Sequence, residues 1–133
     1  MKKYLATMTF CIWVDDNEGN KEAIEEKYQN HFIHADQANE VLQASDIIII
    51  TGFTLVNNTF RELKQSFPDQ CQVVLVGPSS SFIPDILFKN KVNLVGAIRI
   101  TDPGKVMQLV SEGASGFHFF KHSCAEKLCL INE

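Results

Sequence analysis

The sequence lacks the features of membrane-spanning and nucleic-acid-binding proteins. No apolar run approaches the roughly 20 residues that cross a bilayer, so we expect no membrane partner. Basic residues are few, with 12 Lys and Arg against 16 Asp and Glu, which gives a formal net charge of −4. Binding to a nucleic-acid backbone needs a cationic face, so we also expect no nucleic-acid partner. The 133 residues, 45% of them hydrophobic, suffice for a single domain over 1–133 with an apolar core.

The glycine patterns of the common nucleotide and nucleophile sites are missing as well. GxGxxG does not follow the first predicted strand, and the acidic loop 15–19 in its place would repel a pyrophosphate. There is neither a GxxxxGK[ST] loop nor a GxSxG nucleophile elbow. We therefore expect no standard NAD or ATP site. The sequence leaves open whether the chain is an enzyme, and Asp102 is the strongest candidate for a general acid or base.

Cysteine pairs and a clear secretory signal are also absent. The four cysteines stand far apart without a CxxC pair, which favours free thiols in a reducing compartment. The start of the chain, 1–14, has two lysines before a weakly apolar stretch, as a signal peptide does. However, Asp15 and Asp16 stand where small residues should mark cleavage. We interpret the segment as a strand of a cytoplasmic protein.

Strand-like and helical segments alternate along the chain. Apolar, β-branched runs predict strands at 9–14, 46–51, 72–76 and 93–100. Helical spacing predicts helices over 19–29, 36–44, 57–67, 81–90 and 102–112. This order predicts right-handed βαβ units, and therefore a three-layer Rossmann-like α/β domain with a mainly parallel sheet. The strand-like tail segments 117–122 and 128–131 predict a short C-terminal strand pair.

One of these strands, Ile47–Ile50, is apolar on both faces. A strand with one wet face should alternate between apolar and polar residues. We therefore expect this segment to be a central parallel strand that is covered by helices on both sides.

Polar residues follow three of the predicted strands. In an open parallel sheet, ligands bind beyond the carboxyl ends of the strands, so these three corners should converge on one rim. The first corner contains Thr51, Gly52, Thr54, Asn57 and Thr59, the second contains Gly77, Pro78, Ser79 and Ser80, and the third contains Arg99 and Asp102. Each corner also has a purely structural interpretation, because the same residue types form turns and helix caps, and Arg99 can pair with a carboxylate.

Two histidines of the tail, His118 and His122, are weak candidates for metal ligands. They would share one face of a strand because they stand an even number of residues apart. Their spacing matches only part of a zinc pattern, so exposed histidines without a metal are the favoured interpretation.

Three motifs together resemble a known family. The segments 46–59, 74–80 and 101–113 are similar to the I-T-G-x-T-L-x-N-x-T, G-P-S/T-x-P-x-x-P and D-P-x-x-V…E-G patterns of the Rossmann-like domain in the putative heavy-metal chelation family. The likeness runs from about residue 35 to residue 130. Only one proline of the middle motif is changed, since Ser81 and Phe82 stand near its usual place.

This resemblance implies a small-molecule or metal-chelate ligand at the carboxyl edge of the sheet, and a metal ion or metal chelate as the cofactor. Family members usually carry an N-terminal domain similar to that of enolase, which is absent here, so we expect a stand-alone shortened relative or a fragment. The expected partner is then a second copy of the chain or a separate protein that supplies the N-terminal domain. Two alternatives are an enzyme of metal-chelator or cofactor metabolism and an oligomerising scaffold.

Overall fold

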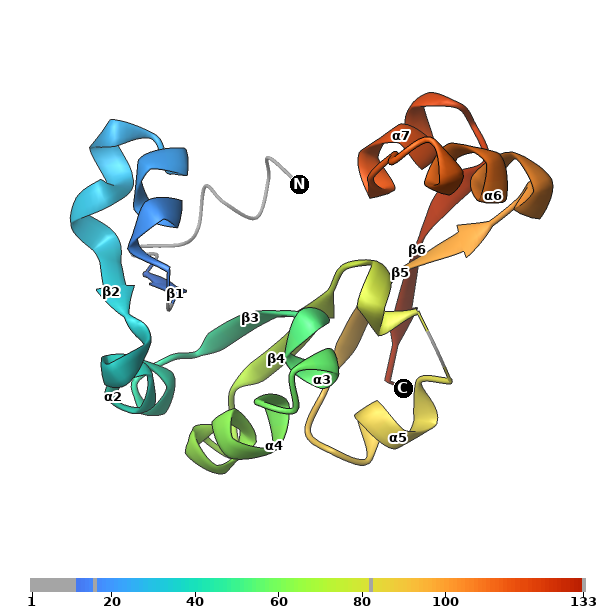
Figure 1. The fold of residues 1–133 in the computed structure, drawn as a ribbon. Helices are drawn as coiled ribbons and strands as arrows, with labels where there is room; N and C mark the ends of the chain where they lie inside the picture. The colour runs from blue at the N-terminus through green and yellow to red at the C-terminus, as the bar shows by residue number, and fades with distance from the viewer. Residues whose placement is uncertain (1–11, 16, 82, 133) are drawn as a thin grey trace.

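The structure is a computed structural model that describes residues 12–15, 17–81 and 83–132 (Figure 1). It contains a parallel pair, β1 (Trp13–Asp15) and β2 (Phe32–His34). It also contains a four-stranded sheet in the order β3 (Ile47–Thr51), β4 (Gln72–Val76), β5 (Leu94–Ile100) and β6 (Ala125–Ile131). Strands β3, β4 and β5 are parallel, and β6 runs antiparallel to β5. The predicted α/β class with a mainly parallel sheet is confirmed, and the C-terminal strand β6 forms an antiparallel pair with β5.

Short helices connect the strands. The link between β1 and β2 consists of the 3-10 helices η1 (Glu18–Ala23) and η2 (Glu26–His31). The links to β3 and β4 contain η3 (Ala35–Gln37), α2 (Ala38–Gln43), α3 (Phe53–Val56), α4 (Phe60–Leu63) and η4 (Lys64–Ser66). The remaining links contain η5 (Pro78–Ser80), α5 (Asp85–Phe88), α6 (Pro103–Ser111) and α7 (Gly116–Lys121). Among the described residues, no helix has the length and apolar character needed to cross a membrane.

The tail departs from the prediction, because 117–122 lies in helix α7 and its C-cap and not in a strand. Ser115 and His118 form a capping box, in which each side chain bonds to the other residue's backbone. This local bonding fixes the first turn of a helix and outweighs the β-propensity of the phenylalanines. The second tail segment does form a strand, and β6 pairs with β5 along its whole length.

The core lies on one face of the four-stranded sheet. Val73, Leu75 and Val95 point to this face and have no exposed surface. Phe60 of α4 and Leu87 of α5 pack against them. The core therefore lies between this face and the helices of the β3–β4 and β4–β5 connections.

The opposite face of the sheet is largely uncovered along β3. Ile47 and Ile49 are 48% and 63% exposed, whereas Ile48 and Ile50 between them are buried. Moreover, β3 stands at the end of the strand order within the described residues. The prediction of a central strand covered on both sides is therefore wrong. The run of isoleucines reflects the β-propensity of branched side chains, which holds at exposed positions too.

The β1–β2 pair and its two 3-10 helices lie to one side of the four-stranded sheet in Figure 1. Neither η1 nor η2 contains a buried residue, and β2 is only half-buried. The predicted helix over 19–29 is thus replaced by two tighter turns. Of the predicted strand 9–14, residues 9–11 lie outside the described residues, as do Cys11 and most of the signal-like start.

Candidate ligand site at the carboxyl edge of the sheet

The first two predicted corners are neighbours at the carboxyl edge of the sheet. The register places Thr51 beside Val76 and Val76 beside Gly96. Just beyond them, the Gly52 amide donates to the Val76 carbonyl at 2.6 Å, and the Gly77 amide donates to the Gly96 carbonyl at 3.0 Å. Backbone hydrogen bonds thus continue past the ends of β3 and β4 and fix the two loops beside each other.

Gly52 allows an unusually close approach between these loops. A Cβ atom on Gly52 would lie 2.6 Å from the Ser80 amide nitrogen and 3.0 Å from the Ser79 carbonyl carbon. Real Cβ atoms do not approach backbone atoms so closely, so only glycine fits here. In the second loop, Gly77 has a φ of 116°, a conformation that also requires glycine. We call this contact between Gly52 and the backbone of Ser79 and Ser80 the Gly52–Ser80 junction.

The serines after β4 form hydrogen bonds with the backbone of β5 where that strand extends beyond the end of β4. The buried Ser80 hydroxyl lies 2.5 Å from the Gly77 carbonyl oxygen and 2.9 Å from that of Gly96. The Ser81 hydroxyl oxygen accepts from the Ile98 amide at 2.9 Å. These two side chains stand in for a missing strand partner, and this structural role had no signal in the sequence.

The polar residues of the first corner bond mainly to one another. The buried Thr54 hydroxyl donates to the Thr51 carbonyl at 2.8 Å, and the Thr51 hydroxyl oxygen accepts from the Phe53 amide at 3.3 Å. The Thr59 hydroxyl and amide both donate to Asn57 Oδ1, at 2.8 and 3.2 Å. Among the predicted residues of these two corners, the exposed ones are Thr51, Asn57, Pro78 and Ser79.

The third corner lies further along the direction in which the parallel strands run. Strand β5 continues for four residues after Gly96, which places Ile100 roughly 13 Å beyond the other two strand ends. Asp102 caps α6, since its Oδ1 accepts from the Lys105 amide at 2.9 Å. Arg99 forms an ion pair with Glu126, its cross-strand neighbour on β6. Both residues therefore have the structural partners that the alternative interpretation predicts.

Helix α7 returns to the second corner. A Cβ atom on Gly116, its first residue, would lie 3.6 Å from Cγ of Pro78, which is ordinary van der Waals contact. The proximity of the tail to this rim was not predictable from the sequence, because Gly116 follows Pro78 by 38 positions, with α5 and α6 between them. Figure 1 shows α6 and α7 together beyond the end of β5.

The metal-binding candidates do not form a site among the described residues. His118 and His122 lie on or next to a helix, where a spacing of four also places them on one face. His118 Nδ1 accepts from the Ser115 amide at 3.1 Å. No group of three or more His, Cys, Asp or Glu side chains that could hold a metal ion occurs in the described part of the chain. His118 and His122 therefore lack the additional ligands that tight binding of a heavy-metal ion by the described residues would need.

Two titratable groups near the opposite, amino edge of the sheet have shifted pKa values, Asp69 and Cys71. Burial raises the pKa of the Cys71 thiol. The ammonium of Lys91, 2.7 Å from Asp69 Oδ1, lowers the pKa of that carboxyl group by hydrogen bonding and charge attraction. Cys71, Cys124 and the exposed Cys129 are free thiols.

The sheet order and the glycine-bridged loops define a Rossmann-like α/β fold with a polar rim at the carboxyl edge. The sequence matches the DUF364 family, described as putative heavy-metal chelation, over residues 11–129. The chain therefore belongs to this family.

Two solved structures from the same family share the fold. One is a protein of unknown function from Pyrococcus horikoshii, with a TM-score of 0.77 and 18% identity. The match covers 99% of this chain and 52% of the Pyrococcus protein. The other, also of unknown function, is from Desulfitobacterium hafniense DCB-2, with a TM-score of 0.65 and 16% identity. The match covers 90% of this chain and 51% of the Desulfitobacterium protein. The chain thus spans about half the length of these two proteins. The search of curated proteins found no match.

Proposed function

We propose that this chain is a binding domain for a metal chelate or a similar small polar molecule, held at the carboxyl edge of the sheet. The observation that supports this most is the Gly52–Ser80 junction. It fixes two strand-end loops against each other, and Thr51, Asn57 and Ser79 in these loops are exposed residues with polar side chains. Rigid loops at the carboxyl ends of parallel strands are the usual ligand site of such sheets.

The chemistry of this rim favours a chelate over a free metal ion. Hydroxyl and amide groups donate hydrogen bonds to carboxylates, whereas transition metals prefer imidazole and thiolate ligands. The described residues contain no cluster of such ligands. In this proposal the chelator coordinates the metal, and the protein binds the carboxylates of the chelator.

Calorimetry with zinc citrate, with citrate alone and with Zn²⁺ alone tests the proposal. We expect zinc citrate to bind most tightly and Ser79→Ala to weaken it by about tenfold, the effect of one hydrogen bond to a charged group. Ser111→Ala is the matched control, because its hydroxyl bonds only to the Gln108 carbonyl of its own helix. Tighter binding of Zn²⁺ alone, or unchanged binding by Ser79→Ala, would contradict the proposal.

The uncovered sheet face favours a second function, in self-association. Sheets built from parallel strands almost always have both faces covered. Apart from Thr51, Gln72 and Lys127, the side chains of this face are apolar, for example Ile49 and Ile131, so two copies could pack face to face without opposing rows of charge. A sheet face of four strands, each at least five residues long, has an area of roughly 300 Å². This area is well below the ~800 Å² that each partner buries in a standard interface. We therefore propose a weak homodimer.

Sedimentation velocity across a concentration series tests the dimer. The protein should shift from monomer to dimer as its concentration rises, and Ile49→Lys should abolish this shift. Ile86→Lys is the control, because Ile86 is equally exposed but lies on α5, on the other side of the sheet. A protein that stays monomeric at every concentration, or an equal effect of both variants, would overturn this second proposal.

A further inference from the structure

The first turn of helix α7 is capped by a histidine ring. His118 Nδ1 lies 3.1 Å from the amide nitrogen of Ser115 and 3.1 Å from its hydroxyl oxygen. A backbone amide can only donate a hydrogen bond, so Nδ1 must carry a lone pair in this arrangement. The proton of the neutral ring is therefore at Nε2.

Protonation of His118 removes this bond. Both ring nitrogens of an imidazolium are donors, so an N–H group at Nδ1 would face the Ser115 amide, which is also a donor. His118 also stands in the first turn of α7, where the positive end of the helix dipole disfavours a cation. The cap therefore exists while His118 is neutral, and it is lost as the pH falls through the range of about 5 to 8 in which histidines ordinarily change charge.

The charged groups around α7 bond to partners other than His118. Helix α6 and strand β6 pack against α7, and Pro78 of η5, an element without charged side chains, lies beside its first residue. The charged residues of α6, its caps and β6 are Asp102, Lys105, Glu112, Glu126 and Lys127. Asp102 caps α6, and Lys105 and Glu112 both bond to Gln108. Glu126 pairs with Arg99, and Lys127 Nζ lies 5.4 Å from the centre of the Phe120 ring.

The remaining charged neighbours are on α7 itself, where Lys121 and His122 are both basic. Among the described residues, no carboxylate forms an ion pair with His118. An imidazolium at this position would therefore gain no ion pair in exchange for the lost cap.

The cap holds the start of α7 at the second corner of the rim. Gly116, which follows Ser115, lies in van der Waals range of Pro78, as its Cβ position 3.6 Å from Pro78 Cγ shows. The other end of α7 is held separately, because the amide and the thiol of Cys124 both donate to the Phe119 carbonyl, at 3.0 and 3.3 Å. Loss of the cap should loosen the first turn and leave the end of the helix in place.

We propose that Ser115 and His118 form a pH-sensitive latch, which holds the start of α7 against Pro78 when His118 is neutral and releases it when His118 is protonated. The step is the transfer of one proton from solvent to Nδ1, after which the Ser115 amide has lost its acceptor. The latch does not depend on what the rim binds, because its bonds lie within the tail. It makes the packing of α7 on the rim respond to mild acidification.

Hydrogen exchange of the backbone amides, followed by NMR, tests the latch. Between about pH 7.5 and about pH 5, the protection factors of the Ser115 and His118 amides should fall about fivefold, the effect of losing one capping bond. The protection factor of the Cys124 amide should not change. Long-range ¹H–¹⁵N spectra of the unmodified protein near pH 7.5 should show His118 as the Nε2–H tautomer. The Nδ1–H tautomer, or constant protection of the two amides, would overturn the proposal.

Two substitutions on the same helix make the test specific. His118→Gln keeps an acceptor that does not titrate, in the residue type of the common capping box, so protection should no longer change with pH. His122→Gln is the matched control, because His122 is exposed at the C-cap of α7, and the fall in protection should persist. A pH response that survives in His118→Gln or disappears in His122→Gln would refute the role of His118.

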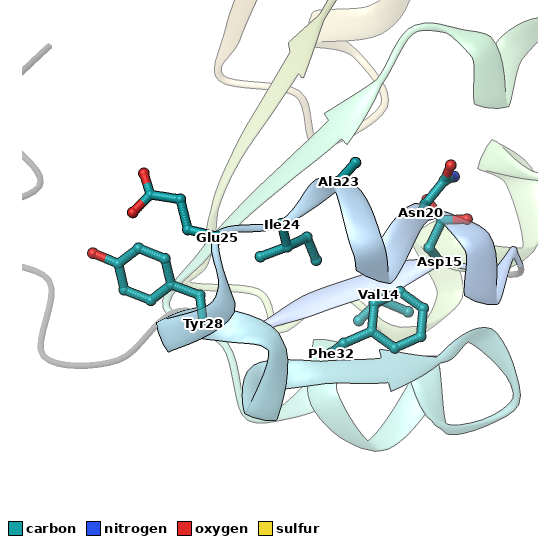
Figure 2. Close-up of a pocket in the computed structure, with 8 residues that line it drawn as sticks. All are labelled: Val14, Asp15, Asn20, Ala23, Ile24, Glu25, Tyr28 and Phe32. Atoms are coloured by element: carbon teal, nitrogen blue, oxygen red, sulfur yellow. The ribbon is translucent and has the colours of Figure 1, made fainter.

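The other two of the four histidines do not confuse this readout. His31 and His34 stand on either side of Phe32, whose ring lines the N-terminal cavity in Figure 2. Strand β2, which contains Phe32 and His34, lies far from α7 in Figure 1. Their titration should therefore move amide signals near residues 31–36, and a pH response at 115–118 reports on the tail.

Discussion

Replacing Gly52 by alanine tests the junction that supports the proposed rim site. The new methyl carbon would lie 2.6 Å from the Ser80 amide nitrogen and 3.0 Å from the Ser79 carbonyl carbon. Both obstacles are backbone atoms, so relief requires a shift of the whole loop and not a side-chain rotation. Such overpacking typically costs about 1–3 kcal/mol.

A loop shift would also strain the hydrogen bonds that fix the two strand ends. The Gly52 amide bond to Val76 and the Ser80 hydroxyl bonds are the ones affected, each contributing about 1 kcal/mol. We therefore expect Gly52→Ala to lower the free energy of unfolding by about 2–3 kcal/mol. For a chain of this length, the midpoint of thermal unfolding should fall by about 6–15 °C.

Thermal and urea unfolding followed by circular dichroism measure this change. Gly104→Ala is the matched control, because the nearest atom to its new Cβ is Asp102 Oδ1 at 3.5 Å and alanine favours the helix in which it lies. The control should unfold within about 1 kcal/mol of the wild type. If Gly52→Ala unfolds at the same midpoint as this control, the tight junction does not exist.

Three further predictions concern the sheet and its titratable groups. Ile50→Ala should lower the free energy of unfolding, measured by urea denaturation, by about 2–4 kcal/mol, because Ile50 is buried. Ile49→Ala should lower it by less than about 1 kcal/mol, because Ile49 is 63% exposed. Equal losses would contradict the assigned faces of β3. Iodoacetamide should modify Cys129 well before Cys71, which is buried and has a raised pKa; faster labelling of Cys71, read by mass spectrometry, would refute its burial. The lowered pKa of Asp69 means that its ion pair stabilises the fold above the unfolded pKa of about 3.9 and loses this effect as the pH falls. Asp69→Asn should therefore lower the midpoint of thermal unfolding near neutral pH and leave it unchanged near pH 2. A lower midpoint near pH 2 with no change near neutral pH would contradict the lowered pKa of Asp69.

The sequence predicts the sheet of this protein better than its surroundings. Alternating apolar runs and helical stretches were sufficient to predict parallel strands, and parallel strands necessarily place Gly52 and Gly77 at one edge. The exposure of Ile49 was not predictable, because its chemistry is the same as that of the buried Ile50 beside it. Helix α7 was missed because its start depends on a bond between Ser115 and His118, which resembles no common capping pair.

The details of the rim at the carboxyl edge of the sheet were harder to predict from the sequence. The serines after β4 appeared to form a polar cradle, but Ser80 is buried and bonds to two carbonyl oxygens of the sheet edge. That role depends on β5 being longer than β4, and strand ends are poorly defined by sequence patterns.

The most direct test of the proposed function is an amide NMR titration with zinc citrate. We predict that the signals that move will be those of the rim, residues 52–57 and 79–81, and that they will saturate together. Movement confined to the loops at the opposite edge, residues 68–71 and 90–93, would contradict a ligand site at the carboxyl ends of the strands.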